Sequence, residues 1–175
     1  MNAWNTILKG GFSGTSGWSG AVVMEDIHKF LDYAGDTHRF WEMYEIEKGG
    51  TRDLIFKTSN KWTHLVWNIW SEDDCIISAW ISPVVTSYGT PEAFPRVGPV
   101  NTNVAPHTNV QLFSNPVVSN PGALVGRWWK DMNRTAKAIF VPNLDYMARI
   151  VNKYHKRIRV NLCTHWHELV PVSEP

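Results

Sequence analysis

The segment Cys163-Thr-His165-Trp-His167 has the residue types and the spacing of a metal-binding strand. Alternate residues of a β-strand point to the same face, so Cys163, His165 and His167 would form one row. Several β-barrel and cupin-like enzymes hold Zn²⁺ or Fe²⁺ with such residues. A catalytic metal also needs a third or fourth ligand, which the sequence does not place near this row. We therefore expect no metal or other cofactor, and the competing interpretation of the row is surface polar residues at a strand end.

A second group of residues could contact nucleic acid. The segment Gly126-Arg-Trp-Trp-Lys130 places two indoles between two cations, and further cations follow it. Bases stack on aromatic side chains and phosphates bind cations, so this mixture is typical of surfaces that bind single strands. Strand alternation, however, requires either Trp128 or Trp129 to point into the core. The predicted contacts are Arg127, Trp128, Trp129, Lys130, Arg134, Lys153, Lys156, Arg157 and Arg159.

No pattern in the sequence predicts catalysis. The Gly-rich segment 10–20 lacks the lysine of a phosphate-binding loop, and Gly17-Trp-Ser-Gly20 does not match a nucleophile elbow. Carboxylates gather in Glu42–Glu47 and in Glu72–Asp74, where we expect solvated strand edges and a turn. These observations favour a protein that binds or assembles over an enzyme.

Apolar runs of strand length would position these residues. Thr63–Trp70 and Cys75–Ile81 are rich in β-branched and aromatic residues, and the acidic turn Ser71–Asp74 separates them. Arg157–His167 is the clearest strand, because apolar and polar residues alternate from Ile158 to Trp166. The other predicted strands are Phe40–Lys48, Thr51–Phe56, Asn109–Phe113, Leu124–Trp129 and Lys137–Val141, while Asp145–Val151 fits either a strand or a helical turn.

The remaining segments complete the predicted organisation. Glu25–Ala34 has apolar residues at helical spacing, acids in its first turn and Gly35 as a C-cap, which predicts one short helix. Pro83–Pro121 contains seven prolines and predicts long loops with short edge strands. Residues 1–20 are rich in Gly and Ser and predict a flexible segment before one domain, residues 21–175. The expected fold is all-β, an antiparallel β-sandwich or jelly roll.

Tryptophan is the unusual part of the composition, with 10 among 175 residues. Each indole is large and its N–H needs a partner, so we expect some of them at interfaces or ligand surfaces. The net charge is +1, but residues 121–160 contain 9 basic and 2 acidic residues. A basic third of this kind can present a face that attracts phosphate.

The composition also limits the cellular compartments in which we expect the chain. Two cysteines do not make the disulfide framework of a small secreted domain. No apolar run approaches the roughly 20 residues of a membrane helix, and the first 20 residues do not resemble a signal peptide. We therefore expect a soluble, intracellular chain without a membrane partner.

The order of segments resembles the single jelly-roll coat proteins of small icosahedral viruses, especially circovirus-like single-stranded DNA viruses. In that family an F-x-x-Y-x-I strand near the start precedes Pro- and Asn-rich loops and a last strand that runs into a Pro-containing tail. Phe40–Ile46 resembles the first of these, Pro83–Pro121 the loops, and Arg157–Pro171 the last strand. Such proteins usually begin with an Arg/Lys-rich arm, whereas residues before Gly20 contain only Lys9.

The resemblance implies a capsid subunit that self-assembles in many identical copies into a virion shell. It implies no enzyme activity, and it leaves genome contact to the folded basic face rather than to an arm. A carbohydrate-binding β-sandwich, in which exposed tryptophans stack on sugar rings, is the first alternative. A cupin-like metalloprotein that uses His165 and His167 is the second.

Overall fold

The computed structural model describes residues 37–93, 97–99, 108–129 and 136–169, which all belong to the unit Leu31–Pro175. Within these ranges every regular element is a strand, so the predicted all-β class is confirmed. The predicted helix Glu25–Ala34 and the predicted flexible segment 1–20 lie outside the described residues. The strands are β1 (Thr37–Ile46), β2 (Thr51–Lys57), β3 (Trp62–Ser71), β4 (Cys75–Ile81), β5 (Val84–Ser87), β6 (Thr90–Pro91), β7 (Val97–Pro99), β8 (Gln111–Ser114), β9 (Val117–Asn120), β10 (Ala123–Trp129), β11 (Ala136–Phe140), β12 (Asp145–Asn152) and β13 (Ile158–Leu169).

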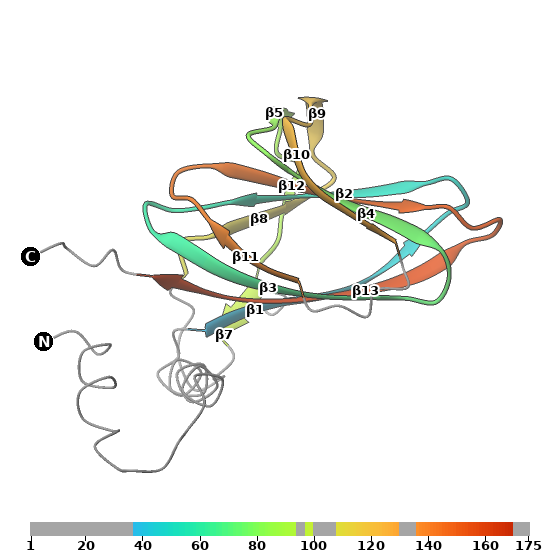
Figure 1. The fold of residues 1–175 in the computed structure, drawn as a ribbon, viewed down its shortest axis with the longest axis horizontal. Helices are drawn as coiled ribbons and strands as arrows, with labels where there is room; N and C mark the ends of the chain where they lie inside the picture. Colours follow the sequence, from blue (N-terminus) through green and yellow to red (C-terminus); the bar gives the residue numbers. More distant parts are fainter. Residues whose placement is uncertain (1–36, 94–96, 100–107, 130–135, 170–175) are drawn as a thin grey trace, which may run out of the picture. The chain divides into compact units, whose positions relative to one another are not determined.

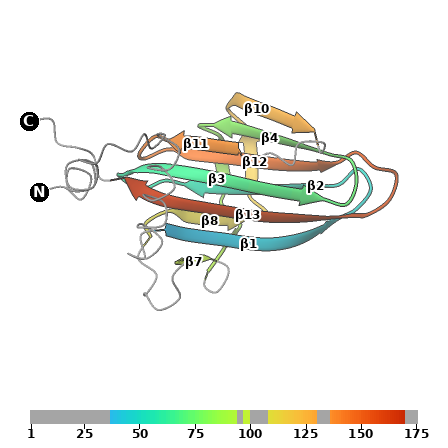
Figure 2. The same cartoon turned by 60° about the horizontal axis from the view of Figure 1, so that its bottom comes forward.

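Two antiparallel sheets face each other across the core (Figure 1). Sheet A has five strands in the order β11-β3-β13-β1-β7, and sheet B has six in the order β10-β4-β12-β2-β8-β6. The short pair β5 and β9 forms a separate ribbon on the outer side of sheet B. The long strands of each sheet run side by side along the molecule (Figure 2).

The strands pair as in a single long hairpin, in which the early strands form one arm and the late strands form the other. The first strand β1 pairs with the last strand β13, β2 pairs with β12, β3 with β11, and β4 with β10. The β1–β13 register runs without interruption from Thr37 opposite His167 to Ile46 opposite Ile158. The first and last described strands are therefore held together inside sheet A.

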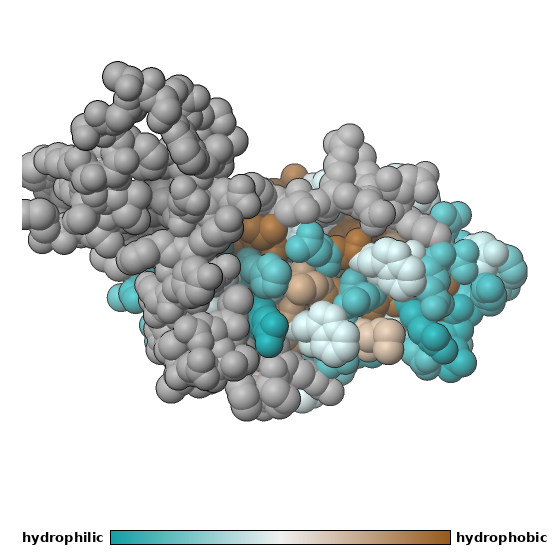
Figure 3. Space-filling view, turned by 90° about the horizontal axis from the view of Figure 1, so that it is seen from below, coloured by the Kyte–Doolittle hydropathy of each residue, from teal (hydrophilic) through white to brown (hydrophobic). Residues whose placement is uncertain are grey.

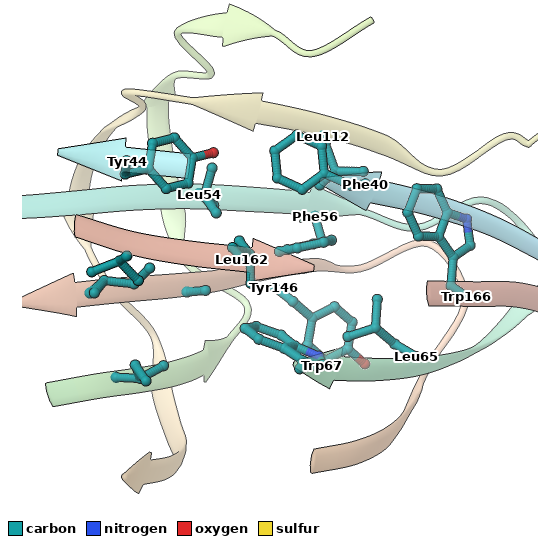
Figure 4. Close-up of a cluster of buried hydrophobic side chains, with 14 of the residues drawn as sticks. Phe40, Tyr44, Leu54, Phe56, Leu65, Trp67, Leu112, Tyr146, Leu162 and Trp166 are labelled. Carbon is teal, nitrogen blue, oxygen red and sulfur yellow. The ribbon is translucent and has the colours of Figure 1, made fainter. Parts of the chain in front are cut away.

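The inner faces of both sheets supply the core (Figure 4). Along β13, the alternation predicted from the sequence is confirmed, because the residues from Ile158 to Trp166 on one face are buried while Arg159 is exposed. The ring of Phe56 lies 5.3 Å from that of Trp67, and Phe140 stacks on Tyr146 at 3.8 Å. A one-residue slip would turn these rings towards water, so the core fixes the register.

The segment Asp145–Val151, which fitted two interpretations, is strand β12. It pairs with β2 on one side and with β4 on the other, and these tertiary hydrogen bonds override the local helical spacing. The predicted strand Asn109–Phe113 begins later, at Gln111. The N–H groups of Asn109 and Val110 donate to the carboxylate of Glu168 instead of to a neighbouring strand.

The Pro-rich segment contains short strands, as predicted, but the strand β8 within the predicted edge strand Asn109–Phe113 lies between β2 and β6 and not at a sheet edge. Its β5–β9 ribbon covers a second cluster of buried side chains on the outer face of sheet B, formed by Ile55, Trp80 and Met147. The Tyr88 hydroxyl donates to Asp145 Oδ2 at 2.6 Å. This bond to a carboxylate, together with burial and the carboxylate charge, raises the pKa of Tyr88 to about 12. Val85 and Val118 of the ribbon pack against the same cluster, so apolar contacts and the bond of the neighbouring Tyr88 hold the ribbon against sheet B.

Candidate interaction surfaces

The outer face of sheet A carries exposed tryptophans from two strands. Trp41 on β1 is 55% exposed and Trp70 on β3 is 53% exposed. Trp41 lies opposite Cys163 and Trp70 opposite Asn161, so β13 runs between the two indoles. Two strand spacings and an offset of two residues separate their Cα atoms by about 12 Å. Two large aromatic groups therefore flank one short stretch of β13.

We call this surface the tryptophan face and define it as Trp41, Met43, Asn68, Trp70, Asn161 and Cys163. The register places all six on the side of sheet A away from the core. Met43 is 52% exposed, and burial raises the pKa of the Cys163 thiol, although Arg39 acts in the opposite direction. The centre of the face therefore carries no charge at neutral pH. Figure 3 views the molecule from this side and shows apolar and pale side chains in the middle of the coloured area.

Charged side chains lie at the two ends of the tryptophan face. Arg39 lies at one end, one row from Trp41. At the other end Arg157 Nη1 lies 3.1 Å from Glu45 Oε2, and Arg159 approaches Glu45 at 3.6 Å and Glu72 at 3.7 Å. Exposed pairs of this kind contribute little to stability. They do neutralise the two arginines, so this end presents no concentrated positive field.

A second exposed apolar surface lies on β10, at the edge of sheet B. Val125 is 65% exposed, Trp129 58% and Leu124 51%. The register of β10 with β4 shifts between Leu124 and Gly126. A Cβ at Gly126 would lie 2.6 Å from the Trp128 ring, so glycine allows this indole to fold over the strand. We call Leu124, Val125 and Trp129 the β10 edge, and a strand edge with apolar side chains is a typical site for pairing with another chain.

The structure distributes the predicted nucleic-acid contacts over both sheets. Trp128 packs against the core and Trp129 points outwards, so the expected division between these two indoles is confirmed. Arg127 lies on the outer face of sheet B, where its Nε donates to Ser78 Oγ at 3.3 Å. Lys130 and Arg134 lie outside the described residues.

The other predicted contacts lie at the start of β13 or just before it. Lys153 and Lys156 are exposed in the connection between β12 and β13, and Lys156 Nζ lies 3.8 Å from Asp73. Arg157 and Arg159 lie at the end of the tryptophan face where Glu45 and Glu72 neutralise their charges. Among the described residues the predicted cations therefore do not share one face, and carboxylates from β1 and the β3–β4 turn accompany several of them.

The predicted metal row lies on one face of β13, where two of its side chains approach each other and the third contacts β3. Cys163 Sγ lies 3.6 Å from His165 Nε2, whereas His167 Nε2 lies 3.1 Å from His64 Nδ1 on β3. His167 is only 7% exposed, so its interpretation as a surface residue is wrong. The sequence could not reveal His64 as its neighbour, because this contact depends on the register of β3 with β13. Within the described ranges no group of three or more His, Cys, Asp or Glu side chains could hold a metal ion.

The tryptophan face and the β10 edge are thus the strongest candidates for function in the described part of the chain. That part contains no helix with the length and apolarity needed to cross a membrane. The sequence matches no known protein-family model and no curated protein.

Proposed function

We propose that the chain is a jelly-roll capsid subunit that self-assembles into a virion shell. The strand order supports the jelly roll. Sheet A contains the run β1-β13-β3-β11, and sheet B contains the run β2-β12-β4-β10. Strands that follow one another along the chain therefore alternate between the sheets, as in a long hairpin that is rolled into two layers. Jelly rolls of this kind occur in viral capsids, but also in lectins and cupins, so the fold alone does not decide among these functions.

The observation that carries the proposal is the presence of two separate exposed apolar surfaces. The tryptophan face belongs to sheet A and the β10 edge to sheet B. One two-fold contact stops at a dimer, whereas a closed shell requires each subunit to use at least two different contacts. Exposed aromatic and aliphatic groups in contiguous patches are typical of protein interfaces. The two surfaces together provide what a shell needs.

The alternatives explain less of the structure. A carbohydrate-binding module could use the tryptophan face, but it leaves the apolar β10 edge without a role. A cupin-like centre needs converging ligands, and His165 and His167 have different neighbours. Contact with the genome is proposed for Arg127 on the outer face of sheet B, because carboxylates accompany the cations of sheet A.

Electron microscopy of the purified full chain tests the proposal. We expect negatively stained images of the parent chain to show closed shells of uniform diameter. Val125→Glu places a charge on the β10 edge and should abolish the shells while the chain stays folded. Asn60→Glu adds the same charge to an exposed loop position and is the matched control, which should assemble like the parent. A folded parent chain that stays monomeric at high concentration would contradict the proposal.

A further inference from the structure

We propose that the tryptophan face packs against the same face of a second copy, around a two-fold axis that reverses the strand direction. This inference rests on the proposed self-assembly and names one of its contacts. The composition of the face favours another protein as its partner. Trp and Met are enriched at the centre of protein interfaces and charged residues are depleted there, while the rim is polar. The uncharged centre around Trp41 and Trp70, with charges only at its ends, has this arrangement.

The exposed area is large enough for such a contact. An aromatic side chain of this size covers roughly 150–250 Å². At 55% and 53% exposure, Trp41 and Trp70 each offer on the order of 100 Å², and the 52% exposed Met43 adds to this area. A specific contact buries roughly 800 Å² on each partner, somewhat more than half of it apolar. The tryptophans and Met43 provide most of that apolar part.

The charges at the ends of the face select the orientation. Hydrogen bonds of the backbone place Glu45, Arg159 and Glu72 in one row across three strands, while Arg39 lies three rows away. A two-fold axis parallel to the strands would bring β1 over β3 of the second copy and Glu45 over its Glu72. An axis across the strands instead brings Arg39 over Glu45 of the second copy. Opposite charges attract and like charges repel, so the second orientation is favoured.

The same orientation also fits the uncharged centre. It places Trp41 of one copy over Met43 of the other, and Trp70 over Asn68 of the other. Each indole therefore faces a smaller side chain, and each contact occurs twice because the interface is isologous. Sheets that pack face to face keep their strands within about 30° of each other, which is compatible with antiparallel stacking of the two β1 strands.

Charge exchange tests this geometry. In the full chain with Val125→Glu, which leaves only the tryptophan face for association, we expect dimers in sedimentation equilibrium. Arg39→Glu puts two carboxylates opposite each other, and Glu45→Arg puts two cations there, so each variant should dimerise at least about tenfold more weakly. A mixture of the two variants pairs opposite charges at both contacts and should restore dimers, which native mass spectrometry would identify as the heterodimer. Circular dichroism checks that both variants are folded.

Several results would overturn the inference. Single variants that dimerise like the parent, or a mixture without heterodimers, exclude the reversed two-fold contact. Trp41→Ser with Trp70→Ser removes two exposed side chains without opening the core, and loss of dimers is expected. If this double variant still forms shells in the otherwise unaltered chain, the inference fails while the capsid proposal stands. If the parent forms no oligomer at all, the capsid proposal itself fails. Quenching of Trp41 and Trp70 by a neutral glucan oligosaccharide, with the parent monomeric, would overturn both in favour of a sugar ligand.

Discussion

Glu168, near the end of β13, accepts hydrogen bonds from the segment that precedes β8. We predict that removing the charge of this carboxylate destabilises the protein. Its Oε1 accepts hydrogen bonds from the Thr108 hydroxyl at 2.7 Å, from the N–H of Asn109 at 2.6 Å and from the N–H of Val110 at 3.2 Å. The Ser59 hydroxyl donates to Oε2 at 3.2 Å. Burial alone would raise the pKa of Glu168, but these hydrogen bonds outweigh it, so the pKa lies below its ordinary value.

The substitution Glu168→Gln retains the shape of the side chain and removes its charge. A hydrogen bond to a charged acceptor contributes about 1 kcal/mol more than one between neutral groups. The two shortest bonds, from Thr108 and Asn109, therefore predict a loss of about 2 kcal/mol in the free energy of unfolding at pH 7. Urea denaturation followed by tryptophan fluorescence measures this loss, and the combination of Val125→Glu, Trp41→Ser and Trp70→Ser in both proteins keeps assembly from contributing.

The pH dependence separates the charge from other effects of the substitution. A carboxyl with a lowered folded pKa stabilises the protein fully above its unfolded pKa, about 4.3, and this contribution disappears as the pH falls through the folded value. The difference in stability between the parent and the Glu168→Gln variant should therefore be largest at pH 7 and shrink below about pH 4. Glu47→Gln, at an exposed position, is the control and should change the stability by less than about 0.5 kcal/mol. An equal difference at pH 7 and at about pH 3, or none at pH 7, would refute the reasoning.

Three further predictions concern single residues. Asn152→Ala should cost about 3 kcal/mol in urea denaturation, because the buried Nδ2 donates to carbonyls at 2.8 to 3.0 Å that would lose their partner; a loss below about 1 kcal/mol would contradict this. Gly126→Ala should lower the melting temperature, since the new methyl group would meet the Trp128 ring at 2.6 Å; an unchanged value would contradict the close contact. Cys163 should react with a disulfide reagent at about pH 8 more slowly than a free thiol, because burial raises its pKa; equal rates would contradict this.

Strand positions could be predicted from the sequence wherever one face is buried. The alternation from Ile158 to Trp166 predicts both β13 and its inward face, because period two leaves only one way to bury the apolar set. The runs that became β3 and β4 were recognisable from their β-branched and aromatic residues. For Asp145–Val151 the local pattern was ambiguous, and only the pairing with two neighbours made it a strand.

The surfaces could be predicted only in part. The number of tryptophans indicates that some are exposed, but not which, since the exposure of Trp41 and Trp70 depends on the pairing of β1 and β3 with β13. The basic segment suggested one face, whereas the sheet order places Arg127 and Arg159 on different sheets. Linear charge counts cannot foresee this division, nor the carboxylates that the fold brings beside Arg157 and Arg159.

The central claim is that copies of this chain bury the tryptophan face and the β10 edge against one another. Sedimentation velocity of the full chain over a wide range of concentration tests it most directly. We predict a discrete, fast-sedimenting species of many copies that grows at the expense of the 20.0 kDa subunit as the concentration rises. A single boundary at the subunit mass over the whole range, from folded protein, would contradict it.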